Sequence, residues 1–73
     1  MPIPEIRLKF ARRLKALRKR LRLTQEEMAE RLEVDTRYYQ RLESGKPGAV
    51  KIDTLDKIAK ALNLTASKLL DFK

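Results

Sequence analysis

A chain of 73 residues is long enough for one small domain, residues 1–73, whose hydrophobic core lies near the lower size limit for independent folding. It contains no cysteine and no histidine, which excludes a disulfide framework, a thiolate metal site and the commonest general base of enzymes. Its net charge of +8 favours a polyanionic partner, and since no apolar run approaches the ~18 residues of a membrane span, we expect a cytoplasmic protein.

The first predicted element is a basic helix over about residues 4–21. Residues 1–23 hold nine Lys or Arg against a single acid, whereas residues 24–45 carry a net charge of −3 and residues 46–73 a net charge of +3. A basic segment beside a less basic unit favours a partner contacted along its phosphates, although a soluble protein with a charged surface has a similar composition. The apolar residues form one stripe at helical spacing, which predicts that the helix buries Phe10, Leu14, Leu17 and Leu21.

Two short amphipathic helices follow, over residues 24–32 and 35–44. Thr24 and Glu27 have the spacing of a capping box at the start of the first of them, and Asp35 offers an N-cap to the second. Gly45 is placed to end the second helix in the left-handed conformation. A helix, a short turn and a second helix in this order can hold one helix out from the body of a small protein and into the DNA major groove.

Two further helices are predicted after a loop at residues 46–50, where Pro and Gly stop the chain from continuing as a helix. The fourth covers about residues 53–62 and ends at Asn63, which tolerates the left-handed conformation. The fifth starts after Thr65 and buries Leu69, with Leu70 or Phe72 as further candidates. With no strand alternation and no repeat, the pattern predicts a compact all-α fold of five helices.

In this order and at this spacing, the residues resemble those of the Cro/phage-repressor family, the lambda-repressor-like or XRE-type helix-turn-helix proteins. The resemblance covers about residues 10–72. It is carried by Leu17-Arg18, by LTQEEMA at 23–29, by LESGK at 42–46, and by the apolar positions of residues 55–69. It implies a five-helix DNA-binding domain with the helix-turn-helix at about 24–45, and a transcriptional regulator of the repressor type.

Two positions depart from the family pattern. Arg22 and Glu33 stand where the family usually has glycine. If either residue is held at positive φ, it costs about 1 kcal/mol relative to glycine. Close packing of the two motif helices also requires a small side chain at Ala29, so that a larger residue there is expected to disrupt the motif.

The resemblance assigns base contacts to the helix that follows Asp35. Arg37 and Arg41 can each give two parallel N–H donors to guanine, and Gln40 can pair with adenine. The alternative is that these are solvated residues on a helix surface. Tyr39 and Leu42 fall where the family packs its core. The base-reading candidates are Thr36, Arg37, Tyr38, Gln40 and Arg41.

Phosphate contacts are likewise implied by the resemblance. A Gln at position 25 binds a phosphate and braces the recognition helix, unless it serves only the helix start. Arg18 and Glu43 match an ion pair between the first and third helices, which keeps Arg18 near the backbone; the alternative is a surface pair worth ~0–1 kcal/mol. The phosphate candidates are Gln25, Arg18, Lys46, Lys51 and Arg22, with Lys19 and Arg20 as weaker ones.

The leading hypothesis is therefore a sequence-specific regulator of double-stranded DNA, without cofactor or metal, located with the nucleoid. Family members usually bind palindromic operators as homodimers, here through the fourth and fifth helices and residues 69–72. The alternative is an antitoxin or other protein-interaction module on the same fold. A basic first helix lying on a membrane is weaker, because its apolar stripe is needed for the core. No catalytic constellation is present, which argues against an enzyme.

Overall fold

The structure, a computed structural model, describes residues 5–45 and 50–71, and this part of the chain folds into five α-helices without a strand. The elements in chain order are α1 (Glu5–Arg20), α2 (Gln25–Leu32), α3 (Thr36–Ser44), α4 (Ile52–Ala61) and α5 (Ala66–Leu69). The all-α prediction is confirmed, and each predicted helix is present with its ends within a few residues of expectation. Phe72 and all of the predicted loop except Val50 lie outside the described residues.

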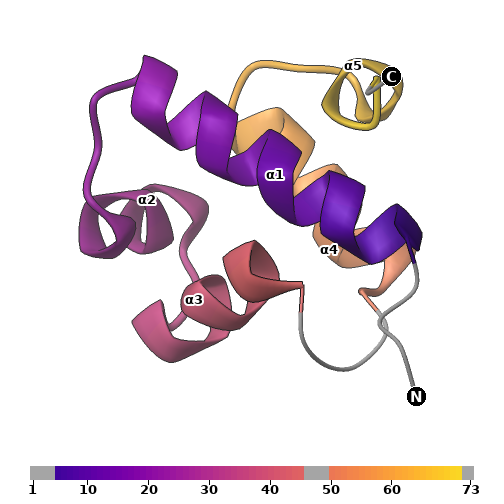
Figure 1. The fold of residues 1–73 in the computed structure, drawn as a ribbon. Helices are drawn as coiled ribbons and strands as arrows, with labels where there is room; N and C mark the ends of the chain where they lie inside the picture. The colour runs from indigo at the N-terminus through magenta and orange to yellow at the C-terminus, as the bar shows by residue number, and fades with distance from the viewer. Residues whose placement is uncertain (1–4, 46–49, 72–73) are drawn as a thin grey trace.

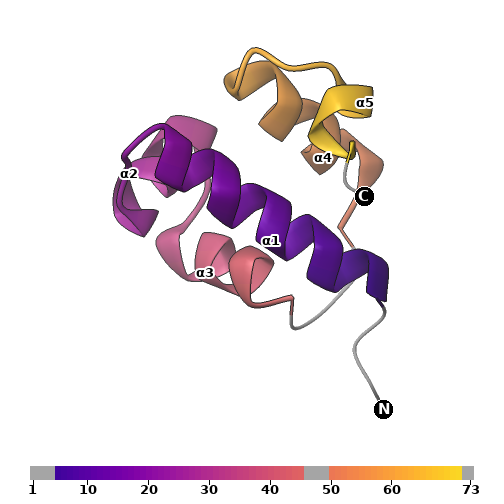
Figure 2. The same cartoon turned by 45° about the horizontal axis from the view of Figure 1, so that its top comes forward.

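The long helix α1 runs across the molecule and separates the other helices into two groups (Figures 1 and 2). It packs against α3, which in turn packs against α2, while α4 contacts both α2 and α5. Figure 2 shows α2 and α3 on one side of α1, with α4 and α5 on the other. The motif helices therefore rest on a scaffold made by α1 and α4.

The core is formed where the apolar stripes of the helices meet. Leu14, Met28, Leu32, Ile58 and Leu69 are fully buried there, and each such side chain contributes about 1.5–3 kcal/mol relative to an exposed one. The predicted core stripe of α1 is confirmed at its first three members. It is wrong at its fourth member, because α1 ends at Arg20, which leaves Leu21 outside the helix and 40% exposed.

The two motif helices begin at the predicted caps. The Thr24 hydroxyl accepts a hydrogen bond from the Glu27 backbone N–H at 3.1 Å, and the Glu27 carboxylate accepts one from the Thr24 N–H at 2.9 Å. The bond from the Thr24 backbone N–H lowers the pKa of Glu27. Asp35 accepts from the Arg37 N–H at 3.0 Å and so caps α3.

Among residues 5–45 and 50–71, three residues other than glycine adopt the left-handed conformation: Arg22, Glu33 and Asn63, with φ of 58°, 57° and 57°. Both residues that stand where the family usually has glycine thus lie at positive φ, so the cost expected for that conformation applies to each of them. Gly45 ends α3 at φ 71°, and a Cβ added there would lie 3.0 Å from the Leu8 side chain. Glycine is favoured at this position by its backbone conformation, and a larger residue would also have to displace the Leu8 side chain.

Candidate nucleic-acid interface

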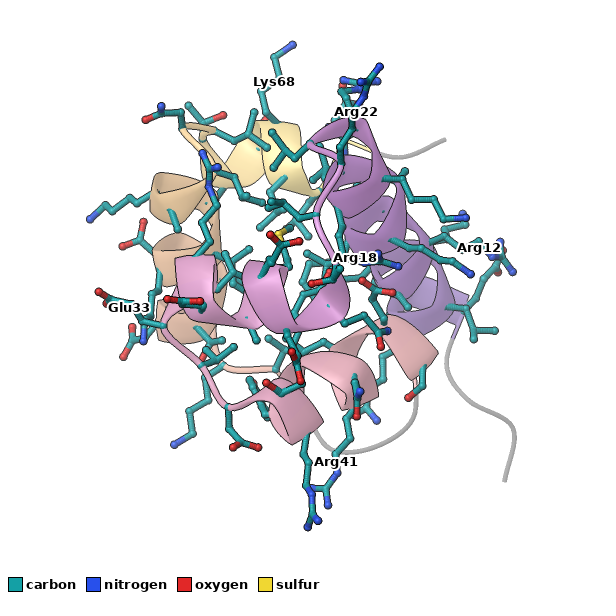
Figure 3. The ribbon with its side chains drawn as sticks, turned by 90° about the vertical axis from the view of Figure 1, so that its left-hand side faces the viewer. Arg12, Arg18, Arg22, Glu33, Arg41 and Lys68 are labelled. Atoms are coloured by element: carbon teal, nitrogen blue, oxygen red, sulfur yellow. The ribbon has the colours of Figure 1, made fainter. Side chains whose placement is uncertain are left out.

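The helix α3 divides its residues between the core and solvent. Tyr39 is fully buried and Leu42 is 7% exposed, which confirms that these two residues anchor the helix. On the outer side, Arg41 projects away from the body of the protein, as Figure 3 shows. The predicted base-reading residues lie on the accessible part of α3: Thr36 is half-buried, and Arg37, Tyr38, Gln40 and Arg41 are exposed.

A partly buried ion pair fastens α3 to α1. The Arg18 Nε donates to Glu43 Oε2 at 2.6 Å, and its Nη2 donates to Oε1 at 3.2 Å. The Arg18 side chain is 14% exposed and that of Glu43 only 5%, so the pair is far less solvated than a surface salt bridge. Arg18 also donates to the Leu23 carbonyl at 2.9 Å, which ties α1 to the segment before α2.

Two further donors complete the surroundings of Glu43. The Tyr39 hydroxyl donates to Oε2, and the Gln25 Nε2 donates to Oε1 at 3.2 Å. Sequence reasoning treated Tyr39 as an apolar core residue and missed its hydroxyl. The available signal was its spacing, because residues 39 and 43 lie one turn apart on the same face of a helix.

The hydrogen bonds set the protonation states of this network. Burial raises the pKa of Glu43, but the bonds from Arg18, Tyr39 and Gln25 outweigh it and leave the pKa below its ordinary value. The bond to Glu43 raises the pKa of Arg18, and burial together with Glu43 raises that of Tyr39. Glu43 is therefore ionised at neutral pH, while Arg18 and Tyr39 keep their protons.

Gln25 links this network to the outer face of α3. Its Oε1 accepts a hydrogen bond from the Gln40 Nε2 at 3.4 Å, while its own amide nitrogen is held by Glu43. Gln40 is one of the candidate base-reading residues. The orientation of its side chain is thus coupled, through Gln25, to the buried carboxylate.

The other predicted phosphate contacts lie at different places on the surface. Lys51 is exposed immediately before α4, and Lys46 lies outside the described residues. Arg22 is also exposed, but Figure 3 places it on the side of the molecule opposite to Arg41. The structure thus brings together Gln25, Arg18 and the residues of α3, and it does not bring Arg22 to them.

The described residues form neither a metal site nor a membrane-spanning helix. Within residues 5–45 and 50–71, no group of three or more His, Cys, Asp or Glu is placed to hold a metal ion. None of the described helices is long and apolar enough to cross a membrane. The surface around α3 presents hydrogen-bond donors and positive charge, which suits recognition of base edges and phosphates.

Comparison with known proteins decides the family. The family model described as "Helix-turn-helix" matches residues 14–69, well over half of the chain. The chain is an XRE-type helix-turn-helix protein. This helix-turn-helix protein is 38% identical over 66 residues to the control protein C.MunI of a Mycoplasma species, across 89% of this chain and 88% of the relative.

Solved structures resemble the helix-turn-helix protein in fold. The clp gene regulator ClgR of Corynebacterium glutamicum has a TM-score of 0.78 and 28% identity, covering 94% of this chain and 72% of that one. The hypothetical transcription factor NHTF of Neisseria has a TM-score of 0.79 and 25% identity, covering 96% and 83%. The helix-turn-helix protein is a DNA-binding transcriptional regulator with the lambda-repressor-like fold, and it is not an enzyme.

Proposed function

We propose that α3 enters the DNA major groove and reads the sequence there. The observation that carries this proposal is the division of α3 into a buried side and an exposed side that presents Arg37, Gln40 and Arg41. Each Arg can bind O6 and N7 of a guanine, and the Gln40 amide can pair with an adenine. Thr36 and Tyr38 are the adjacent candidates for contacts to bases.

The phosphate contacts hold α3 in register on the duplex. Gln25 is the first residue of α2, where unpaired backbone N–H groups and the helix dipole attract an anion. Its Nε2 carries a second N–H beside the one that binds Glu43, and this N–H is free for a phosphate oxygen. Arg18, Lys46 and Lys51 are the proposed further contacts.

The operator in this proposal is palindromic and is bound by a homodimer, because one helix covers too few base pairs for a specific site. Two α3 helices would then lie about 34 Å apart, one DNA turn. The dimer contact is assigned to an apolar patch at the end of the molecule away from α2, formed by the starts of α1 and α4 and the end of α5 (Figure 1).

The apolar patch contains both a protrusion and a recess. Ile52 is 80% exposed, Ile6 60% and Leu70 38%. Ile6 and Leu70, together with Phe10 and Leu55, are among the residues that line a hollow of about 260 Å³. Ile52 does not line it, but it lies between Val50 and Leu55, which do. Around a two-fold axis, the exposed side chains of one copy can fill the hollow of the other, so the patch is complementary to itself. A second copy of the chain is therefore the proposed occupant.

We infer repression as the outcome of binding, because a dimer that covers an operator with α3 in the groove competes with other proteins for the same DNA. A place in the cytoplasm, with the nucleoid, follows from the proposed DNA partner. The leading experiment selects bound fragments from a pool of random duplexes. Affinity for the selected palindrome is then compared with that for a scrambled duplex at about 150 mM salt.

Variants of α3 test the base contacts. Arg37→Ala and Arg41→Ala should each weaken binding by about 1–3 kcal/mol and relax the preference at one base pair of each half-site. Lys51→Ala should weaken binding to every sequence alike and reduce the salt dependence by about one unit. A folded protein that binds no duplex specifically would overturn the proposal in favour of a protein-interaction module.

A further inference from the structure

The outer side of α1 and the turn after it carry a row of cations that the proposed operator contacts do not use. We call it the outer basic face: Arg12, Lys15, Lys19, Arg20 and Arg22, all exposed. No acidic residue occurs between Glu5 and Glu26. The row is therefore not a mixed charged surface of the kind that serves solubility alone.

None of these five side chains has an acidic partner in the described part of the structure. The ion pairs found there join other residues, such as Lys9 with Glu5 and Arg18 with Glu43. Like charges three or four residues apart destabilise a helix by about 0.2–0.5 kcal/mol per pair, and the row contains such pairs between positions 12, 15 and 19. The outer basic face thus lowers the stability of the free protein.

Members of the face lie apart from the Arg41 side chain of α3 (Figure 3). In Figure 3, Arg12 projects sideways from α1, and Arg22 projects on the side opposite to Arg41. Lys68 of α5 points the same way as Arg22, and α5 is held beside α1 by the bond from Arg13 Nη2 to the Lys68 carbonyl at 2.9 Å.

Arg22 adds an independent observation. It adopts φ 58°, a conformation that costs most L-residues about 1–2 kcal/mol and that glycine adopts freely. The backbone of the α1–α2 turn therefore gains nothing from an arginine at this position. A side chain kept in a disfavoured backbone conformation is a reason to look for a binding role.

We propose that the outer basic face binds the phosphate backbone of a second DNA duplex, so that the protein bridges its operator to another DNA segment. Flexible, unpaired Lys and Arg without a hydrogen-bonding partner are suited to phosphates and carry no sequence readout. The dimer patch lies at the start of α1 and the outer basic face extends to its end, so both surfaces can be used together. The inference rests on the proposed operator binding by α3.

The test is a bridging assay with the full chain. A biotinylated operator duplex on beads captures the protein, and retention of a second, fluorescent duplex of unrelated sequence is measured across a salt series. In the same samples, the anisotropy of labelled operator reports operator binding. We expect Arg12→Gln combined with Lys15→Gln to keep operator affinity within twofold and to lower the salt slope for the second duplex by about two units.

Two control variants separate a specific role of the outer basic face from a general loss of positive charge and from an effect of the substituted side chains. Lys57→Gln with Lys60→Gln removes the same charge from α4 and should leave bridging unchanged. Ala16→Gln places a glutamine on the same exposed side of α1 without removing a cation, so it should also bridge normally. Since positions 12 and 15 are exposed and glutamine forms helices about as well as arginine and lysine, loss of bridging by the double variant cannot be attributed to unfolding.

Failure of operator binding and failure of bridging can be told apart. Failure of operator binding itself would count against the function of α3, whatever the second duplex does. Operator binding without any retained second duplex, or equal retention by the Arg12/Lys15 variant, would overturn the bridging proposal. Preferential binding of vesicles of anionic phospholipid over the second duplex, tested by co-sedimentation, would overturn it in favour of a membrane surface.

Discussion

Glu43 places one negative charge where three helices meet, and its donors come from all three: Arg18 from α1, Gln25 from α2 and Tyr39 from α3. Glu43→Ala leaves the Arg18 guanidinium in a poorly solvated site without its counterion. We expect a loss of about 3 kcal/mol in the free energy of unfolding, measured with urea at pH 7, together with weaker operator binding. Unchanged stability with unchanged affinity would refute the role given to the network.

The same carboxylate makes stability depend on pH in a defined direction. Its pKa is lowered in the folded state, so its stabilising effect is complete above the ordinary pKa of a glutamate and is lost as pH falls through the folded value. The difference in unfolding free energy between wild type and Glu43→Gln should therefore be largest near pH 7 and shrink below about pH 4. Glu27 titrates in both proteins and cancels from the comparison. A difference that stays constant down to pH 3 would contradict this assignment.

In contrast to Glu43, replacement of Glu33 by glycine is expected to stabilise the protein. It ends α2 at φ 57°, while Lys57 donates to its backbone carbonyl at 3.1 Å, a bond that any residue at this position preserves. Glu33→Gly should raise stability by about 1 kcal/mol and the melting temperature by roughly 4–8 °C. Glu33→Ala removes the same side chain without relieving the backbone. Equal melting temperatures for the Gly and Ala variants would show that the conformation carries no cost.

At the scale of elements, the contact of α2 with its neighbours depends on Ala29, which is 1% exposed. Ala29→Leu adds three carbons to a filled space and should cost about 1–3 kcal/mol while displacing α2 from α3. The matched control is Ala16→Leu, the same change on the exposed side of α1. Thermal melts and operator binding should separate the two variants. A stable, fully active Ala29→Leu protein would contradict the packing described here.

The helices could be predicted from sequence because their signals are local. Thr24 with Glu27, Asp35 and Gly45 are chemical markers of helix ends, and apolar spacing orients the helices between them. Leu21 was misassigned because periodicity alone does not tell where a helix stops. The hydrogen bonds from Gln25 to Glu43 and from Gln40 to Gln25 join residues 15 to 18 positions apart. Such contacts depend on how α2 and α3 cross, which no local pattern encodes.

For the whole molecule, the patch proposed as the dimer contact leads to a prediction about assembly. Ile52 is the first residue of α4, where an acidic side chain interacts favourably with the helix dipole, and it is 80% exposed. Ile52→Glu should therefore leave the isolated chain as stable as wild type. In a two-fold dimer, two buried isoleucines worth about 1.5–3 kcal/mol each would become two buried carboxylates, which should weaken dimerisation by at least about a hundredfold.

Sedimentation velocity over a concentration series measures the dimerisation directly, and binding to full and half operators shows its consequence for DNA recognition. Ile52→Glu should bind a half-site duplex like wild type and lose the additional affinity that the palindrome gives, because the second α3 is no longer held at the second half-site. Leu21→Glu makes the same chemical change on a residue 40% exposed at the other end of α1, and it should still dimerise. If Ile52→Glu dimerises like wild type, the two copies do not meet at this patch, and the spacing of their α3 helices must be set by another surface.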